Sequence, residues 1–428
     1  MGQGRSDLRR RLGLIDATAI ALGAIIGAGV FVVLGEAAGI VGTALPLAVL
    51  IAAAVAFCDG LSAAELGVSY PEAGGPYEFG YVLISPVVGF TAGWIYLFAN
   101  LAASTTFTLG FASYLQPLVP SLPLRPAAVA LAILAVAVNL VGVQQSGRVN
   151  DLLVAFKVVV LLIFIGVGLA LLPVWRHTPL LPFSLSGLPR ASALIFFAYA
   201  GFARIVLIAG EVRDPTHTLP RAVIASLVIS TVLYLIVAVV ALGLAGPQAL
   251  AGSPAPLRTA LEPSNLTWAE TLVSLGGLVA TSDVLLTNIW GLSRLLYAMA
   301  GRGDMPSFLH RLDSRRLPRN AVLIIGLVTI PLVATVGFGP ALLASSLGQL
   351  AYYGIMNVAA LRLRPIQRLY PGVISWVGLA ATVGLAASLP LQSVLALAVV
   401  VAVGLVYYVL RRRARRDDSH EGGRGSRP

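Results

Sequence analysis

The sequence predicts an all-α integral membrane protein with about twelve transmembrane helices. Hydrophobic residues make up 58% of the 428 residues and charged residues only 11%, against about 25% charged residues in a soluble domain. Apolar runs of the roughly 20 residues needed to cross a bilayer about 30 Å thick follow one another along the chain. Short segments rich in arginine separate these runs, as in polytopic membrane proteins.

We expect a short cytoplasmic tail over residues 1–11, a membrane domain over residues 12–410, and a basic tail over residues 411–428. The last segment is expected to be disordered because it contains almost no apolar residue. The expected spans are centred near Gly27, Ile51, Leu97, Leu134, Leu162, Tyr199, Leu233, Leu285, Val328, Leu350, Leu379 and Val401.

The distribution of basic residues predicts the orientation in the membrane. An even number of spans places both termini on one side, and 22 of the basic residues fall on that side against four on the other. This asymmetry predicts cytoplasmic termini in the plasma membrane. The formal net charge of +11 therefore indicates contact with lipid and not with nucleic acid.

The first span carries three glycines near its middle, within the segment from Gly23 to Phe31. Glycine is costly inside a helix, so we expect the helix to unwind at Gly27, Ala28 and Gly29. The exposed backbone N–H groups would bind an anionic group, helped by the dipole of the following half-helix. The alternative is that these small residues allow close packing of helices.

The sixth span carries a comparable break at Gly201, after Phe197 and Ala200. Breaks in the first and sixth spans fit two inverted repeats of five spans, followed by two C-terminal helices, with a site between the repeats. Backbone N–H groups and carbonyls at such a site match the carboxylate and the ammonium of an α-amino acid.

Lys157 is the single lysine of the chain and lies within the fifth span. A buried lysine can release its proton, whereas arginine keeps its charge, so we expect Lys157 to take part in proton coupling. The alternative is that its side chain reaches back to the interface. Asp283 is a second charge within a span, and either pairs with Lys157 or lines a water-filled cavity. Arg204 is a third, with Glu211 as a candidate partner.

Four motifs in order resemble the amino acid–polyamine–organocation (APC) family of transporters, over about residues 12–410. The first is the segment from Gly23 to Phe31. The others are Tyr70–Phe79; Asn139–Val143 with Ser146, Gly147, Arg148 and Asn150, leading to Lys157; and Ser293–Ala300 with Gly303 and Pro306.

This resemblance implies a LeuT-like fold, alternating access and a substrate held at the two breaks. The carboxylate would meet backbone at Gly27, Ala28 and Gly29. The ammonium would meet carbonyls near Ile25, Phe197 and Ala200, beside Gly201.

The resemblance also assigns roles to side chains. Asn100 falls where relatives touch the substrate side chain, and Phe197 or Phe202 would gate the pocket. Some relatives place a lysine such as Lys157 where sodium-driven relatives bind sodium, which favours protons as the coupling ion. Many relatives have an acidic residue shortly after the sixth-span glycine, but here Ala203 and Arg204 follow Phe202. We therefore expect a neutral amino acid substrate and not a cationic one.

Other functions remain as alternatives. Exchange of amino acids and polyamine transport belong to the same class, whereas a membrane sensor would need a signalling domain that we do not expect in such short tails. We expect no enzyme, metal or cofactor, because no nucleophile and base are grouped and no histidines have metal-ligand spacing. The four histidines, all in expected loops or tails, are His177, His217, His310 and His420.

Overall fold

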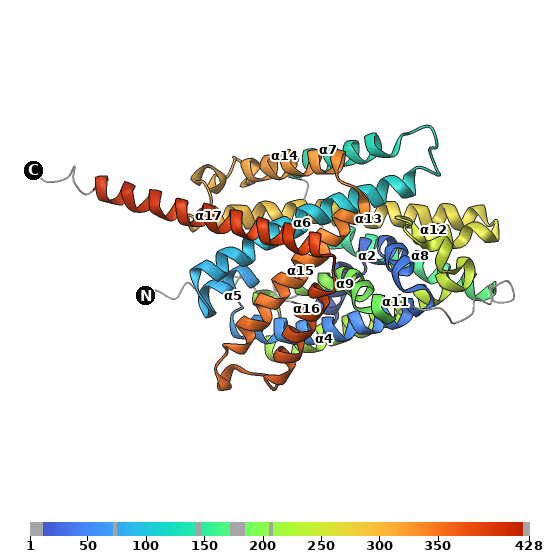
Figure 1. Cartoon of the computed structure of the whole chain (residues 1–428), viewed down its shortest axis with the longest axis horizontal. Coiled ribbons are helices and arrows are strands. Elements are labelled where there is room, and N and C mark those ends of the chain that lie inside the picture. Colours follow the sequence, from blue (N-terminus) through green and yellow to red (C-terminus); the bar gives the residue numbers. More distant parts are fainter. Residues whose placement is uncertain (1–11, 72–74, 143–146, 172–184, 205–208, 423–428) are drawn as a thin grey trace, which may run out of the picture.

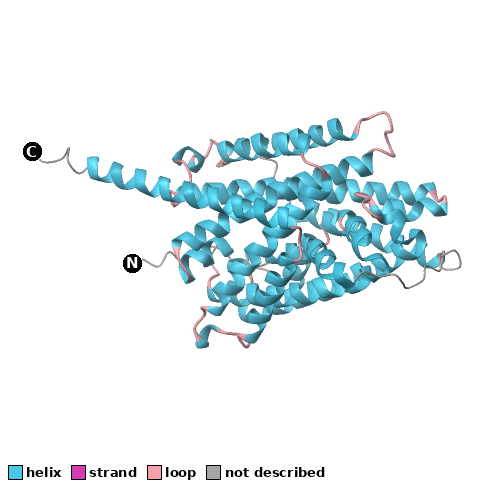
Figure 2. Ribbon diagram, in the orientation of Figure 1, coloured by secondary structure: helices cyan, strands magenta, loops and turns pink. Residues whose placement is uncertain are grey.

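The computed structural model describes residues 12–71, 75–142, 147–171, 185–204 and 209–422. These residues form helices joined by short connections, and none of them forms a β-strand (Figure 2). The expected tail over residues 1–11 and parts of two motifs, at residues 72–74 and 143–146, lie outside the described residues.

The α-helices fall into an N-terminal and a C-terminal series. The first series comprises α1 (Leu14–Ile25), α2 (Ala28–Val32), α3 (Leu34–Val41), α4 (Leu45–Ser69), α5 (Pro76–Leu83), α6 (Pro86–Leu115), α7 (Leu124–Val141), α8 (Gly147–Ala170) and α9 (Leu188–Tyr199). The second comprises α11 (Pro215–Leu250), α12 (Pro256–Leu261), α13 (Thr267–Gly301), α14 (Arg319–Thr335), α15 (Phe338–Leu361), α16 (Val373–Ala387) and α17 (Leu391–Gly422). Short 3-10 turns are η1 (Gly42–Ala44), η3 (Leu185–Gly187), η4 (Ala200–Ala203), η5 (Ala209–Glu211), η6 (Glu262–Ser264), η7 (Ser307–His310) and η8 (Pro365–Gln367).

The expected centres of the spans agree with these helices. Nine segments of the described chain are long and apolar enough to cross a membrane, and α14 and α16 are shorter apolar helices. The remaining expected span, centred near Leu350, is α15, whose 24 residues include buried polar side chains such as Gln349 and Asn357. Eleven of the twelve expected centres lie within a helix, and Gly27 lies at the break between α1 and α2.

Two groups of helices surround the centre of the molecule. α6 packs along α13 and α15, and α4 packs along α11 and α9. α7 and α14 lie side by side at one edge, and α17 runs along the outside against α6 (Figure 1). The apolar side chains of Leu395, Val399 and Val403 on α17 are more than half exposed, as expected for a surface that faces lipid.

The C-terminal segment differs from the disorder expected for it. Residues 411–422 continue α17 as a helix, and residues 423–428 lie outside the described residues. Arginine and alanine are good helix formers, and extending an existing helix avoids the cost of nucleation. A low apolar content therefore did not prevent helix formation here.

Candidate functional site

The first membrane segment is interrupted near its middle, as its glycines predicted. α1 ends at Ile25, Gly27 has an extended conformation with φ −102° and ψ −145°, and α2 begins at Ala28. No side chain caps α2, so its first amide groups are available to a ligand. Val33 keeps helical dihedral angles between α2 and α3, so the second half of this segment is nearly continuous.

The polar backbone at this break is only partly free. The amide of Gly27 donates to the carbonyl of Ile25 at 2.7 Å, and the hydroxyl of Tyr234 donates to the same carbonyl at 2.6 Å. The Ile25 carbonyl, expected to meet an ammonium, is therefore already occupied, and so is the Gly27 amide. The available amide groups at the break are those of Ala28 and Gly29.

The sixth segment is interrupted by a change from α-helix to 3-10 helix. α9 ends at Tyr199, and Ala200–Ala203 form the 3-10 turn η4. The hydroxyl of Tyr353 donates to the carbonyl of Ala200 at 2.5 Å. The hydroxyl of Tyr234 also lies 3.4 Å from the carbonyl of Ala198, so one phenol touches both breaks.

The two interrupted segments pack directly against each other. A methyl carbon added at Gly29 would lie 2.5 Å from the Cα atom of Ala198, and one added at Gly201 would overlap the carbonyl of Ala24. Small residues at both positions therefore allow close contact between helices, which was the alternative interpretation of the first-span glycines. The glycines serve both the break and the packing.

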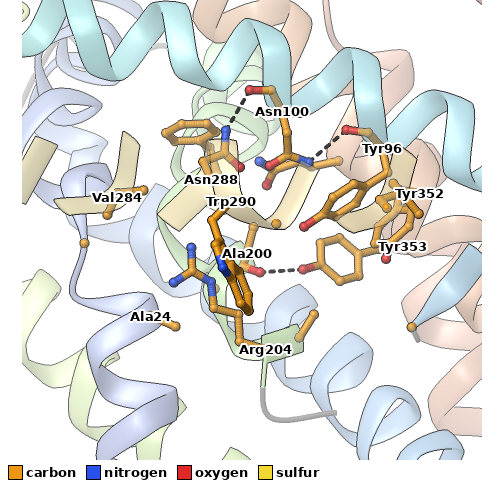
Figure 3. A pocket seen from close by; sticks show the side chains of 18 of the residues that line it. Ala24, Tyr96, Asn100, Ala200, Arg204, Val284, Asn288, Trp290, Tyr352 and Tyr353 are labelled. Carbon is orange, nitrogen blue, oxygen red and sulfur yellow. Dashed lines mark hydrogen bonds between the residues drawn. The ribbon is translucent and has the colours of Figure 1, made fainter. Parts of the chain in front are cut away.

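A cavity of about 510 Å³ lies between the broken segments and helices α6, α13 and α15. Figure 3 shows side chains from these elements converging on it. The cavity-lining residues that the sequence predicted as substrate-binding are Ile25, Gly27, Ala28, Gly29, Asn100, Phe197, Ala200 and Gly201.

Phe202 lies outside this cavity. Its side chain is 0% exposed and packs on the ring of Tyr353, with 4.9 Å between ring centroids. The 3-10 turn directs it toward Gly60 on α4 and away from the cavity. Phe197, the other candidate gate, does border the cavity, and its ring centroid lies 5.4 Å from that of Phe107, which also lines it.

Uncharged polar side chains line the cavity opposite the breaks. Asn100 donates to the carbonyl of Tyr96, and Asn288 donates to the carbonyl of Asn100 at 2.8 Å (Figure 3). Asn288 also donates to the hydroxyl of Ser104 at 2.9 Å. Gln349 on α15 also lines the cavity, and its buried Oε1 has no partner among the described residues. Amide side chains within apolar spans were a usable signal for Asn288 and Gln349, which sequence reasoning missed.

Arg204 projects into the cavity from the residue after η4. Its guanidinium donates to the hydroxyl of Thr287 at 3.1 Å. The expected pairing with Glu211 does not form, since the structure shows no bond between the two side chains within the described ranges. Glu211 is exposed, and its backbone carbonyl accepts from the amide of Leu12.

The cavity extends toward α5 and the end of α13. Arg302 contacts Glu78 in an ion pair at this mouth, and Tyr77 and Tyr81 both donate to the carboxylate of Asp304. Burial and the neighbouring Asp304 raise the pKa of both phenols, so they remain hydrogen-bond donors at neutral pH. These contacts join α5 to the segment after α13.

Lys157 and Asp283 form a buried ion pair between α8 and α13. The ammonium lies 2.8 Å from Asp283 Oδ2, and the two side chains are 0% and 7% exposed. Pairing, left open by the sequence, is confirmed, and the interpretation that Lys157 reaches the interface is wrong. Asp283 Oδ1 has no partner within the described part of the chain.

The ion pair lies behind the first break and does not line the cavity. Val284 follows Asp283 and approaches Gly27, where an added methyl carbon would lie 2.7 Å from Val284 Cγ2. On α8, Val154 is in the same relation to Gly23 of α1. The helices that carry the two charges therefore contact both sides of the interruption.

Comparison with known proteins identifies a family model and several similar transporters. A family model described as amino acid permease matches residues 16–420. An uncharacterized transporter of Mycobacterium tuberculosis is 37% identical over 99% of this chain and 97% of its own length.

Two further relatives come from Bacillus subtilis. A branched-chain amino acid permease is 28% identical over 88% of this chain and 85% of its own length. A methylthioribose transporter is 28% identical over 84% of this chain and 82% of its own length. The match of the family model over nearly the whole membrane domain, together with the broken helices and the cavity between them, shows that this chain belongs to the amino acid permease family.

Proposed function

We propose that this protein transports neutral L-amino acids across the plasma membrane by alternating access, coupled to protons. The observation that carries the proposal is the cavity of about 510 Å³ between two interrupted helices. The uncapped amides of Ala28 and Gly29 suit the substrate carboxylate. The carbonyls near the second break, with Asn100 and Gln349, suit the ammonium and a polar or small side chain.

The shape of the cavity supports an inward-open conformation. Its lining continues to Glu78 on α5 and to Arg302, its ion-pair partner, and α5 lies at the end of the molecule where both termini lie (Figure 1). The excess of arginine on that side indicates the cytoplasm. At the other end, Phe107 and Phe197 meet, and Gly29 packs on Ala198, which closes the path.

The charges around the cavity argue against a cationic substrate. The one carboxylate among its described lining residues is that of Glu78, which pairs with Arg302 at the mouth. Arg204 and Arg294 add positive charge to the lining. The same observation favours an acidic amino acid as the second candidate substrate, since a side-chain carboxylate would pair with Arg204.

The Lys157–Asp283 pair supports coupling to protons. Because the ion pair lies behind the first break, a rearrangement of α1 would change the distance between Lys157 and Asp283. Separation of the two charges favours transfer of a proton between Lys157 and water. The change in protonation of Lys157 would then accompany the change between inward-open and outward-open states, because an unpaired buried charge is costly.

The test is uptake by the purified protein in proteoliposomes. A panel of radiolabelled neutral, acidic and cationic amino acids is offered with and without an inward proton gradient. Methylthioribose is included because one relative is named for it. Neutral amino acids should accumulate only with the gradient.

Two results would contradict the proposal. Equal counterflow with and without the gradient, and no net accumulation, would indicate an exchanger. Uptake of no amino acid at all would reject amino acid transport.

A further inference from the structure

A second ionisable group lies inside the helix bundle, away from the Lys157–Asp283 pair. Asp59 is near the middle of α4, and Asn357 faces it from α15. Both residues are 0% exposed, and the amide Nδ2 of Asn357 donates to Asp59 Oδ1 at 2.7 Å. Neither residue lines the substrate cavity.

Each partner in this contact has one oxygen that no donor reaches. Asp59 Oδ2 and Asn357 Oδ1 are both buried and have no hydrogen-bond partner among the described residues. A carboxylate has only acceptors, so it satisfies the amide N–H and leaves the amide oxygen alone. A carboxylic acid has an additional O–H donor, and it pairs with a carboxamide through two parallel hydrogen bonds. One proton on Asp59 therefore satisfies both orphaned oxygens.

The surroundings of Asp59 offer no compensating positive charge. Within the described ranges no cation forms a salt bridge with it, in contrast to Asp283, whose charge is balanced by Lys157. Gly378 of α16 closes the site, because a methyl carbon added there would lie 3.0 Å from both Asp59 Oδ1 and Asn357 Oδ1. An uncompensated buried carboxylate is costly, so the neutral acid is favoured.

The other titratable groups around the pair do not place a compensating positive charge beside Asp59. Cys58 on α4 and Tyr353 on α15 lie within electrostatic range of Asp59. Arg204, beyond Tyr353, donates to Thr287. Glu65, further along α4, accepts from two backbone amides, and α16 has no ionisable residue. The ionisable residues of α11 are engaged elsewhere or exposed; they are His217, Arg221 and Tyr234.

We propose that Asp59 and Asn357 form a proton-binding site, separate from the substrate cavity and from the Lys157–Asp283 pair. In this conformation the site is occupied: the proton is covalently bound to Asp59 Oδ2 and hydrogen-bonded to Asn357 Oδ1. Release of the proton to water leaves two acceptors facing each other, and this repulsion separates α4 from α15.

The site is connected to the second break through α15. Asn357 lies one helical turn after Tyr353, whose hydroxyl holds the carbonyl of Ala200. Movement of α15 away from α4 would therefore act on the hydrogen bond at the break. Occupancy of the proton site and the geometry of the cavity are in this way linked by one helix.

The test is infrared difference spectroscopy of the purified full-length protein in detergent, titrated with acid and base in the absence of any amino acid. A protonated buried carboxyl gives a C=O stretch that is resolved from the amide and carboxylate bands and shifts in D₂O. We expect this band in the wild type at neutral pH and its loss in Asp59→Asn. The asparagine retains two parallel hydrogen bonds with Asn357, so the variant should fold.

Ser62→Ala is the matched control, since Ser62 is a buried polar residue on the same face of α4, bonded to Ser375 of α16 at 2.9 Å. It should retain the band. A wild-type spectrum without the band at neutral pH, or a band that persists in Asp59→Asn, would overturn the proposal.

A second variant keeps the proposal testable if Asp59→Asn fails to fold. Asn357→Ala removes the amide that donates to the Asp59 carbonyl oxygen, so the C=O band should move to higher wavenumber and titrate at a different pH. A band that keeps both its position and its titration in Asn357→Ala would show that the proton is held elsewhere. Because no substrate is present, this outcome is independent of the proposed transport function.

Discussion

Removing one partner of the Lys157–Asp283 pair should destabilise the protein far more than removing both. At the 2.8 Å separation of Nζ and Oδ2, the Coulomb attraction is about 6 kcal/mol for an effective dielectric constant of about 20. Desolvation of both ions offsets part of this attraction, and loss of one partner from a buried pair costs about 3–5 kcal/mol. The single variants Asp283→Asn and Lys157→Met should therefore lower the midpoint of thermal unfolding in detergent.

The double variant Lys157→Met with Asp283→Leu separates stability from coupling. Replacement of a buried ion pair by apolar side chains is often neutral or stabilising, so its unfolding midpoint should return to that of the wild type. Its uptake should no longer respond to a proton gradient in proteoliposomes. Full proton-driven uptake by the double variant would refute the coupling role, and single variants as stable as the wild type would refute the reasoning about the ion pair.

Three further substitutions test the site. Tyr234→Phe removes the hydroxyl that touches both breaks and should raise the KM for uptake, since a lost hydrogen bond to a buried acceptor costs about 1–3 kcal/mol. Gly201→Ala should abolish substrate binding measured by calorimetry, because its methyl group overlaps the Ala24 carbonyl, whereas Gly166→Ala should bind normally. Arg204→Ala should admit cationic amino acids in competition assays; unchanged exclusion of lysine would show that this charge does not set selectivity.

The course of the chain through the membrane was predictable because each span must be apolar along its own length. The break at Gly27 was predictable for a similarly local reason, since glycine weakens a helix wherever it occurs. The conformation at the second break was not, because a 3-10 turn and an opened helix have the same composition. Phe202 was misplaced for this reason, as the turn decides the direction of its side chain.

Contacts between segments far apart in the chain could not be predicted from the sequence, because they depend on how the helices pack. Lys157 and Asp283 are 126 residues apart, and each was visible as a charge within a span, but their pairing depends on how α8 packs on α13. Asn288 and Gln349 come to the cavity from separate helices for the same reason. Asp59 carried the same signal as Asp283, an ionisable group in an apolar run, and its neutral partner Asn357 is evident only from the fold.

The phenol of Tyr234 has a single hydrogen to give, yet it lies near two carbonyls on two different interrupted helices. The hydroxyl oxygen lies 2.6 Å from the carbonyl oxygen of Ile25 and 3.4 Å from that of Ala198, so the hydrogen bond to Ile25 is the stronger of the two. If α1 tilts away from α9 during the transport cycle, this hydrogen can pass from one acceptor to the other without exposure of either to lipid. α11, which carries the tyrosine, would then remain in place as a common contact for α1 and α9 while they move.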